Sequence, residues 1–263
     1  MSVNPTGSYY SQFREDRLLE QIFLGKKTGL CVEVGAHDGI TGSNTYHFER
    51  NGWKCVLVEP VPELCERIRQ FRTGPVFNCA ASSNTGEAAF YIADAIESWS
   101  ALHLTESQKE RITAGKTAMR EIKVMKRKLD DILNEADVSE VDFISIDVEG
   151  HELDVLKGFS TERFRPRILI IEDNGENACS NVPKYMEGKG YKKFFRTGVN
   201  DWYGMRFDPV VTPEYTARLK TCLRRYEFED RIKQRYVFLN TFLPPFMKNF
   251  LSIVLRWIST IIK

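Results

Sequence analysis

The sequence lacks several features that would assign a protein to a class by themselves. Its 263 residues contain no Cys-x-x-Cys pair, so the six cysteines indicate neither a zinc site nor a disulfide framework. The net charge is only +1, which gives no indication of nucleic-acid binding. The first residues carry neither a basic segment nor an apolar run, so no secretory signal is visible. We therefore expect a cytoplasmic protein without a nucleic-acid partner.

A G-x-G-x-x-G motif is also absent, although its surroundings are typical of a nucleotide-binding unit. Residues 30–34 form a β-branched run that leads into the glycine-rich turn 35–39, and the apolar run 54–59 ends on Glu59. In such a βαβ unit, the acid at the end of the second strand accepts hydrogen bonds from the ribose hydroxyls. His37 stands where a pyrophosphate would need bare backbone, which disfavours a nicotinamide-dependent oxidoreductase.

The remaining apolar runs predict an α/β fold. We expect strands at residues 76–80, 141–147 and 167–172, an edge strand at 87–92 and a final antiparallel pair at 191–196 and 202–207. Ser11 is expected to cap a helix over residues 12–23, and residues 62–71 are expected to form another. This pattern predicts a Rossmann-like, mostly parallel sheet with an antiparallel hairpin in residues 1–210, followed by a helical extension in residues 211–263.

Carboxylates accompany four of the predicted parallel strands at their carboxyl ends. They are Glu33, Glu59, Asp147 and Glu172. Ligands of open α/β sheets bind outside the carboxyl ends of the strands. One strand-end acid is often incidental, but four on one edge indicate a functional site.

Five motifs, in this order, resemble those of the FkbM-type S-adenosylmethionine (SAM) dependent methyltransferases. They are Tyr10-Ser-Gln-Phe-x-Glu-Asp, Val32-Glu-Val-Gly-Ala-His-Asp-Gly-x-x-x-Ser-Asn-Thr, Glu59-Pro, Ile146-Asp-Val-Glu-Gly-His-Glu and Asn200-Asp-Trp. The resemblance spans about residues 8–207. It implies a class I methyltransferase fold, SAM as cofactor and transfer of a methyl group to a sugar or polyketide hydroxyl.

The resemblance also implies which residues surround the cofactor. Glu59 would bind the ribose, and residues of the turns and strand ends would bind the rest of SAM: Gln12, Glu33, Gly35, Asp38, Gly39, Asn44, Pro60, Ala81, Ser82 and Asp147. Arg14 stands where members of the family often carry glycine.

A sugar hydroxyl is a poor nucleophile at neutral pH, so its methylation needs a base or a metal ion. Asp147 is the first candidate for the base, with Glu149 and His151 as further catalytic candidates close in sequence. The ordinary pKa of histidine lies near 7, but the place of His151 at the start of a helix favours a structural role. Asp147, Glu172 and Asn174 offer oxygen ligands at neighbouring strand ends, which would suit Mg²⁺.

The C-terminal region has a different pattern. Residues 213–236 predict a long polar helix, and residues 246–262 predict a helix with a wide apolar arc and a polar wedge that holds Lys248 and Arg256 but no acid. This pattern fits a helix lying on an anionic membrane, and the two cations within it argue against a membrane-spanning helix. Packing of Phe246–Ile262 on the domain or on a second copy of the chain is the alternative.

Together these features predict a SAM-dependent O-methyltransferase that acts on a sugar of a glycan or of a lipid-linked saccharide. Methylation of another small-molecule hydroxyl, such as that of a polyketide, is the second hypothesis. A third, from a different class, is a non-catalytic SAM-binding scaffold that docks at membranes through its C-terminal segment. The localisation expected from the tail is peripheral, on the cytoplasmic face of the membrane.

Overall fold

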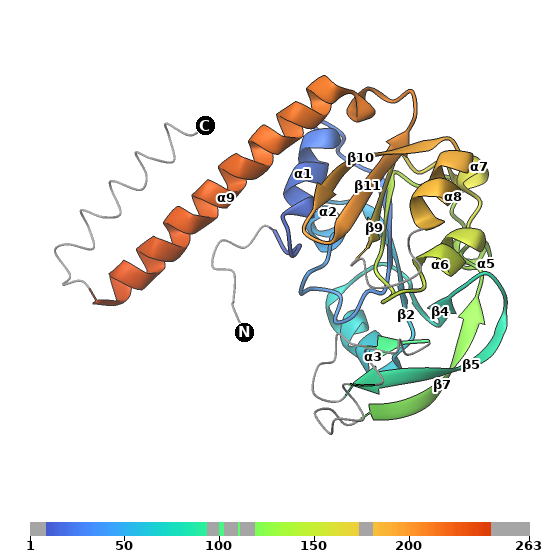
Figure 1. Cartoon of the computed structure of the whole chain (residues 1–263). Helices are drawn as coiled ribbons and strands as arrows, with labels where there is room; N and C mark the ends of the chain where they lie inside the picture. The colour runs from blue at the N-terminus through green and yellow to red at the C-terminus, as the bar shows by residue number, and fades with distance from the viewer. Residues whose placement is uncertain (1–8, 94–99, 103–109, 111–118, 174–180, 243–263) are drawn as a thin grey trace. The chain divides into compact units, whose positions relative to one another are not determined.

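The structure is a computed structural model that describes residues 9–93, 100–102, 110, 119–173 and 181–242 (Figure 1). It divides into two units, Met1–Thr212 and Pro213–Lys263. The predictions for Asn174 and for Phe246–Ile262 lie outside the described residues.

A seven-stranded sheet forms the centre of the first unit, in the order β10-β11-β9-β8-β1-β2-β3. The strands are β1 (Leu30–Val34), β2 (Lys54–Glu59), β3 (Val76–Asn78), β8 (Phe143–Ile146), β9 (Ile168–Glu172), β10 (Tyr191–Thr197) and β11 (Asn200–Met205). The five strands from β3 to β9 are parallel, and β11 runs antiparallel to both β9 and β10. This topology is that of class I methyltransferases and confirms the predicted fold class.

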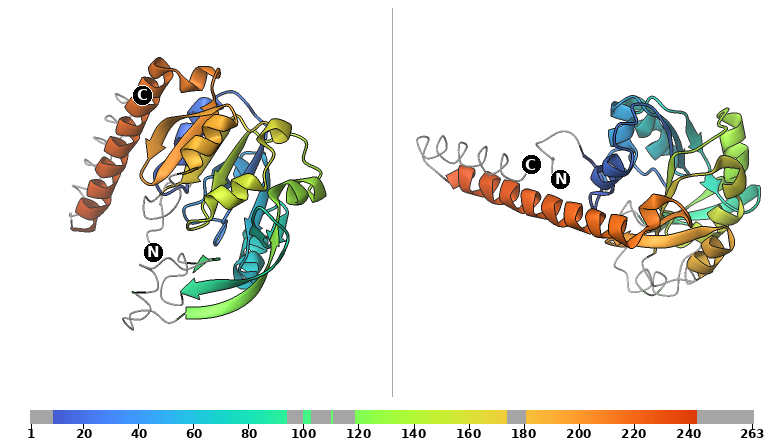
Figure 2. Two further views of the ribbon diagram at one scale, coloured as in Figure 1. Left: turned by 45° about the vertical axis from the view of Figure 1, so that its right-hand side comes forward. Right: turned by 90° about the horizontal axis from the view of Figure 1, so that it is seen from above.

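Helices cover both faces of this sheet (Figures 1 and 2). On one face, alternate strand residues such as Val32 and Ile144 form a buried core with α5 (Leu129–Glu135), α6 (Glu152–Lys157), α7 (Thr161–Phe164) and α8 (Val182–Gly188). On the other face, Phe143 contacts Phe23, which follows α1 (Glu15–Ile22), and Phe48 of α2 (Tyr46–Arg50). Helix α3 (Pro62–Phe71) follows β2. Burial of both faces is why the parallel strands are continuous apolar runs.

A second, four-stranded sheet was not predicted from the sequence. It has the order β4-β7-β5-β6, formed by β4 (Ala80–Ala81), β5 (Gly86–Ala93), β6 (Ser100–Ala101) and β7 (Met119–Arg127). The single strand predicted at residues 76–80 is therefore wrong, because β3 pairs with β2 whereas β4 pairs with β7. Phe90, Ile92 and Val124 form a separate apolar cluster in this sheet.

The second unit contains α9 (Pro213–Phe242), a helix of 30 residues, which follows the short 3-10 helix η2 (Pro209–Val211). Within the described part of the chain, no helix is both long and apolar enough to cross a membrane.

Candidate active site at the carboxyl edge of the sheet

The N-terminal motif forms a tight turn, and the helix begins later than predicted, although Ser11 Oγ does accept the N–H of Asp16, the second residue of that helix, at 3.2 Å. Helix α1 begins at Glu15, and the hydroxyl of Ser11 donates to Asp16 Oδ1 at 2.6 Å. Asp16 also accepts the backbone N–H groups of Tyr10 and Ser11, which holds the chain in the turn. Arg14 adopts a left-handed φ of 70°, a conformation that favours glycine. Gln12, predicted to bind the cofactor, is exposed within this turn.

The neighbouring acid, Glu15, joins the first motif to the last one. Its buried carboxylate accepts hydrogen bonds from Thr197 Oγ1 at 2.7 Å and Asn200 Nδ2 at 2.8 Å, both on the β10–β11 hairpin. Burial raises the pKa of Glu15. The same N-terminal segment also contacts the glycine-rich loop, because the carbonyl of Tyr10 accepts a hydrogen bond from the N–H of Gly42 at 3.0 Å. The segment therefore connects the glycine-rich loop to the hairpin at the carboxyl edge of the sheet.

After β1 and β8 end, the backbone at Gly35 lies very close to that of Asp147. The φ of Gly35 is +84°, and a Cβ at this position would lie 1.8 Å from the carbonyl oxygen of Asp147. Only glycine fits this conformation and this approach. The turn at Gly35 consequently places the backbone of Asp147 directly beside the glycine-rich loop.

Glu59 holds the same turn from the other side. Its carboxylate accepts the N–H of His37 on one oxygen and that of Val61 on the other, both at 2.9 Å. Burial raises the pKa of Glu59 to about 7, against the effect of these two hydrogen bonds. Each oxygen keeps a further lone pair, so ribose binding by Glu59 stays a prediction. The carbonyl of the adjacent Pro60 accepts from Asn78 Nδ2 at 2.9 Å.

The chain after the glycine-rich turn is built around two buried charges, Glu33 and Arg72. Glu33 accepts hydrogen bonds from Ser43 Oγ, the N–H of Asn44 and Thr45 Oγ1, at 2.6–2.8 Å. The Arg72 guanidinium donates to the carbonyl of Gly39 at 2.7 Å and lies 3.5 Å from Glu33. The sequence analysis did not identify Arg72, because a single arginine after a helix carries no recognisable pattern.

These contacts give Glu33 and Gly39 a structural function, and their cofactor contacts stay predictions. Asp38 also stabilises its own turn, since Oδ1 accepts the N–H groups of Ile40 at 2.8 Å and Thr41 at 2.7 Å. Although burial acts in the opposite direction, these hydrogen bonds lower the pKa of Asp38.

Asn44 carries a buried acceptor that no described residue satisfies. Its Nδ2 donates to Ser145 Oγ on β8 at 2.8 Å, but its Oδ1 accepts no hydrogen bond from the described residues, and Asn44 is only 6% exposed. His37 Nε2 is likewise buried without a hydrogen bond. A buried polar atom left unpaired costs about 1–3 kcal/mol. SAM carries an ammonium group, an adenine amino group and ribose hydroxyls, so these residues fit a ligand of its chemistry.

Ala81 and Ser82, predicted to bind the cofactor, are buried at the end of β4. The N–H of Ser82 donates to the carbonyl of Arg127 at 2.8 Å, and a Cβ at Gly158 would lie 2.1 Å from the carbonyl oxygen of Ser82. Their backbone is thus fixed between β7 and the end of α6, and their contact with the cofactor stays a prediction.

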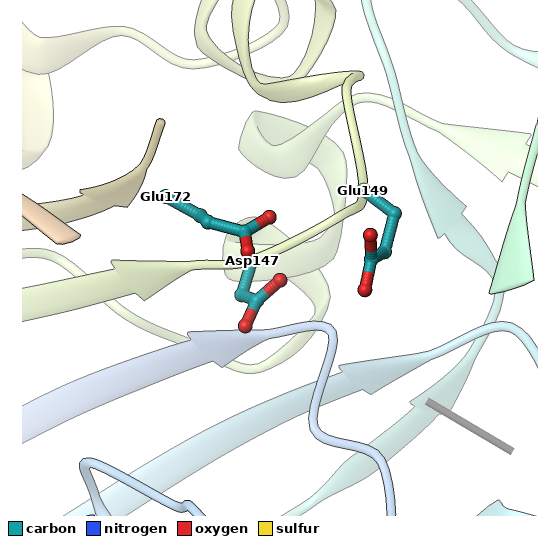
Figure 3. Close-up of side chains that lie close together, drawn as sticks. All are labelled: Asp147, Glu149 and Glu172. Atoms are coloured by element: carbon teal, nitrogen blue, oxygen red, sulfur yellow. The ribbon is translucent and has the colours of Figure 1, made fainter. Parts of the chain in front are cut away.

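Three carboxyl groups meet at the ends of β8 and β9, and we call them the acid trio: Asp147, Glu149 and Glu172 (Figure 3). One oxygen of each lies within 4.8 Å of the others. Glu149 adopts a left-handed φ of 54°, in a turn whose N–H groups at Val148 and Gly150 are held by the buried Glu152. A non-glycine residue in this conformation is strained, as often found at functional sites.

The charges of the acid trio oppose one another. Burial, together with the charges of Asp147 and Glu152, raises the pKa of Glu149 to about 8. Burial and the charge of Asp147 also raise the pKa of Glu172, as does the hydrogen bond that Glu172 donates to the carboxylate of Asp147. Asp147 keeps solvent-accessible surface, yet the surrounding protein desolvates its carboxyl group and raises its pKa. At neutral pH Glu149 and Glu172 therefore favour their protonated forms, and a bound cation would displace those protons.

The structure brings together two of the three predicted catalytic residues, Asp147 and Glu149. His151 is not one of the acid trio, and its Nδ1 lies 3.9 Å from Asp154 Oδ2. Two of the three predicted metal ligands, Asp147 and Glu172, are neighbours. Glu149 completes the cluster, a position that its spacing in the sequence did not predict because it depends on the left-handed turn.

A family model for the FkbM methyltransferase domain matches residues 33–193. The chain belongs to the FkbM methyltransferase family. The matched region contains the glycine-rich loop, Glu59 and the whole acid trio. This FkbM-family chain is thus a SAM-dependent methyltransferase, as the motifs predicted.

The comparison with curated proteins gave no significant match. Among solved structures, a TehB-like SAM-dependent methyltransferase from Corynebacterium glutamicum is similar at 10% identity and a TM-score of 0.43, covering 74% of this chain and 89% of that one. TrmK of M. capricolum in complex with S-adenosylhomocysteine is 10% identical with a TM-score of 0.37, covering 97% and 98%. Precorrin-6y C5,15-methyltransferase from Geobacter metallireducens is 11% identical with a TM-score of 0.39, covering 76% and 90%.

Proposed function

We propose that this FkbM-family chain transfers a methyl group from SAM to a hydroxyl of a sugar, in a glycan or a lipid-linked saccharide. The observation that supports an oxygen nucleophile is the acid trio, which lies where β1 and β8 meet at Gly35. A carboxylate with a raised pKa is a suitable proton acceptor for a hydroxyl near neutral pH.

In this proposal, SAM supplies the methyl group on its sulfonium centre. Asp147 would accept the proton of the acceptor hydroxyl as the oxygen forms its bond to the methyl carbon and the methyl–sulfur bond breaks, which leaves S-adenosylhomocysteine. Glu172 keeps Asp147 ionised before the reaction, because the hydrogen bond that Glu172 donates lowers the pKa of Asp147. Positioning the oxygen in line with the methyl group lowers the activation free energy further, since alignment of the reactants can remove about 7–11 kcal/mol of the barrier in the best cases. Asn44 Oδ1 and Glu59 are the acceptors we assign to the cofactor.

We also propose that the acid trio binds Mg²⁺. Carboxylates, with the remaining positions left to water or substrate, are the ligands that this ion prefers. Mg²⁺ would relieve the repulsion among the three carboxylates and lower the pKa of a bound hydroxyl. The test compares turnover in excess chelator, before and after Mg²⁺ is restored. Loss and recovery of turnover support the metal, whereas full turnover in chelator leaves Asp147 as base without it.

The acceptor is tested directly with the purified chain. It is incubated with isotopically labelled SAM and with fractions of glycans, glycolipids and small molecules from the producing cell, and each fraction is analysed by mass spectrometry. Label in a saccharide supports the proposal, and label only in a polyketide or another small molecule contradicts the sugar acceptor.

A variant pair then separates an enzyme from a non-catalytic scaffold. Asp147→Asn should abolish labelling while SAM binding persists, and Asp154→Asn, which changes an exposed acid on α6, should leave labelling unchanged. A wild-type chain that binds SAM but labels no fraction would support the scaffold instead.

We further propose that residues 246–262 attach the chain to the cytoplasmic face of a membrane or to a second copy of the chain. The apolar arc and cationic wedge in the sequence support either partner. Deletion of residues 246–263 tests this, with vesicle pelleting and sedimentation velocity as the two measurements. Lost pelleting with a monomer throughout supports the membrane, and conversion of a dimer to a monomer supports self-association.

A further inference from the structure

The two units of the chain carry opposite net charges. Residues 213–263 contain ten cationic and four acidic side chains, a net charge of +6, whereas residues 1–212 contain 27 and 32, a net charge of −5. The near-neutral total therefore conceals a strongly basic C-terminal region, whose described part is α9.

Four cations of α9 lie on one side of the helix, and we call them the basic stripe: Lys220, Arg224, Arg231 and Arg235. Their spacings of four, seven and four residues place them within an arc of about 60°, at 100° per residue. All four are exposed, and no ion pair within the described residues involves any of them. Of the four acids of α9, only Glu227 lies beside this arc, so the basic stripe keeps an excess of three positive charges. Phe228, on the neighbouring turns, is also exposed, at 48%.

The other three cations of α9 point away from this stripe. Arg218, Arg225 and Lys233 are exposed on the opposite side of the helix, and Arg225 lies 3.6 Å from Glu229. That opposite side also carries Glu214 and Glu229, whereas the basic stripe has only Glu227 beside its four cations. The larger excess of positive charge on the side of the basic stripe indicates a surface for a negatively charged partner.

The sequence after α9 distinguishes between the possible partners. Residues 243–263 contain three cations, no acid and a majority of apolar side chains. A nucleic acid would neutralise the basic stripe but leave these apolar side chains without a partner, whereas a bilayer with anionic headgroups takes up both.

We propose that the basic stripe of α9 binds the anionic headgroups of a lipid bilayer, so that the helix lies along the membrane surface. This inference extends the proposed membrane attachment from residues 246–262 to α9, and it selects the membrane over a second copy of the chain. It requires neither SAM nor the sugar acceptor, so its failure would leave the proposed methyl transfer untouched.

The test uses the full chain and two triple variants with the same change in charge. Lys220→Gln, Arg224→Gln and Arg231→Gln remove most of the basic stripe, whereas Arg218→Gln, Arg225→Gln and Lys233→Gln remove the cations of the other side. Binding is measured by sedimentation with vesicles of phosphatidylcholine, either alone or mixed with the anionic lipid phosphatidylglycerol.

Each cation near an anionic surface increases the affinity about fivefold, and screening by salt makes the increase smaller for exposed side chains. We expect the stripe variant to lose at least about tenfold in binding to anionic vesicles and the control variant to lose less than about threefold. Equal losses would overturn the proposal, because net charge alone would then explain binding. Failure of the full chain to bind anionic vesicles, or tighter stripe-dependent binding to a labelled RNA duplex, would overturn it as well.

Turnover with a soluble acceptor provides the separate readout. All three proteins should methylate it equally, since the basic stripe contains none of the residues assigned to the active site. If the vesicle results hold but no protein transfers methyl groups, the proposed acceptor fails and the membrane proposal stands.

Discussion

The affinity for SAM should depend on the ionisation of Glu59. Its pKa is raised to about 7 by burial. Ribose hydroxyls donate hydrogen bonds most strongly to the ionised carboxylate, so SAM should bind that form and release a proton. Below its pKa the carboxyl group of Glu59 is protonated in the free protein, so the affinity for SAM should fall as the pH falls.

The size of the effect follows from the same pKa. About nine-tenths of Glu59 is ionised at pH 8 and about one-tenth at pH 6. The dissociation constant of SAM should therefore rise about tenfold from pH 8 to pH 6. Isothermal titration at pH 7, in two buffers with different ionisation enthalpies, should show the release of about half a proton per SAM bound.

Two variants isolate this effect from other titrating acids. Glu59→Gln should bind SAM more weakly and lose the tenfold change with pH. Glu63→Gln removes an exposed acid of α3 that pairs with Arg120, and it should bind as the wild type does. An unchanged pH dependence in Glu59→Gln, or a flat profile in the wild type, would refute the assignment of Glu59 to the ribose.

Three further predictions concern the architecture and chemistry of the site. In urea denaturation, Gly35→Ala should lower the free energy of unfolding by about 3 kcal/mol or more, because the new Cβ would collide with the backbone of Asp147. The control Gly25→Ala has a similar φ but free space around its Cβ, so it should lower the free energy of unfolding by only about 1 kcal/mol. In the same assay, Glu15→Ala should lower the free energy of unfolding by about 2–4 kcal/mol, because Thr197 and Asn200 lose their acceptor. The control Glu66→Ala removes an exposed acid and should change the free energy of unfolding by less than about 0.5 kcal/mol. Asp147→Asn should lower kcat about 100-fold or more, with the dissociation constant of SAM within about threefold of the wild type by titration.

The parallel sheet could be predicted because its strands are buried on both faces and appear as continuous apolar runs. Glu59, Asp147 and Glu172 follow from the same pattern, since each marks the end of such a run. The positive φ of Arg14 is consistent with the glycine that relatives often carry there, so this deviation from the family pattern was informative.

What the sequence did not predict depends on contacts between residues that are distant along the chain. Strand β4 leaves the central sheet because it pairs with β7, which lies far later in the chain: Ala80 pairs with Lys126. Arg72 enters the Glu33 network by tertiary packing, which no local pattern encodes. The contribution of Glu149 to the acid trio arises from a strained turn held by Glu152.

The central claim is that SAM lies at the carboxyl edge of the sheet, between Glu59 and Asp147. A crystal structure of the full chain soaked with S-adenosylhomocysteine tests it most directly. The account predicts ribose hydroxyls within hydrogen-bonding distance of Glu59, an amino group on Asn44 Oδ1 and the sulfur atom directed toward Asp147. A nucleoside bound elsewhere, or one in contact with neither acid at this edge, would contradict it.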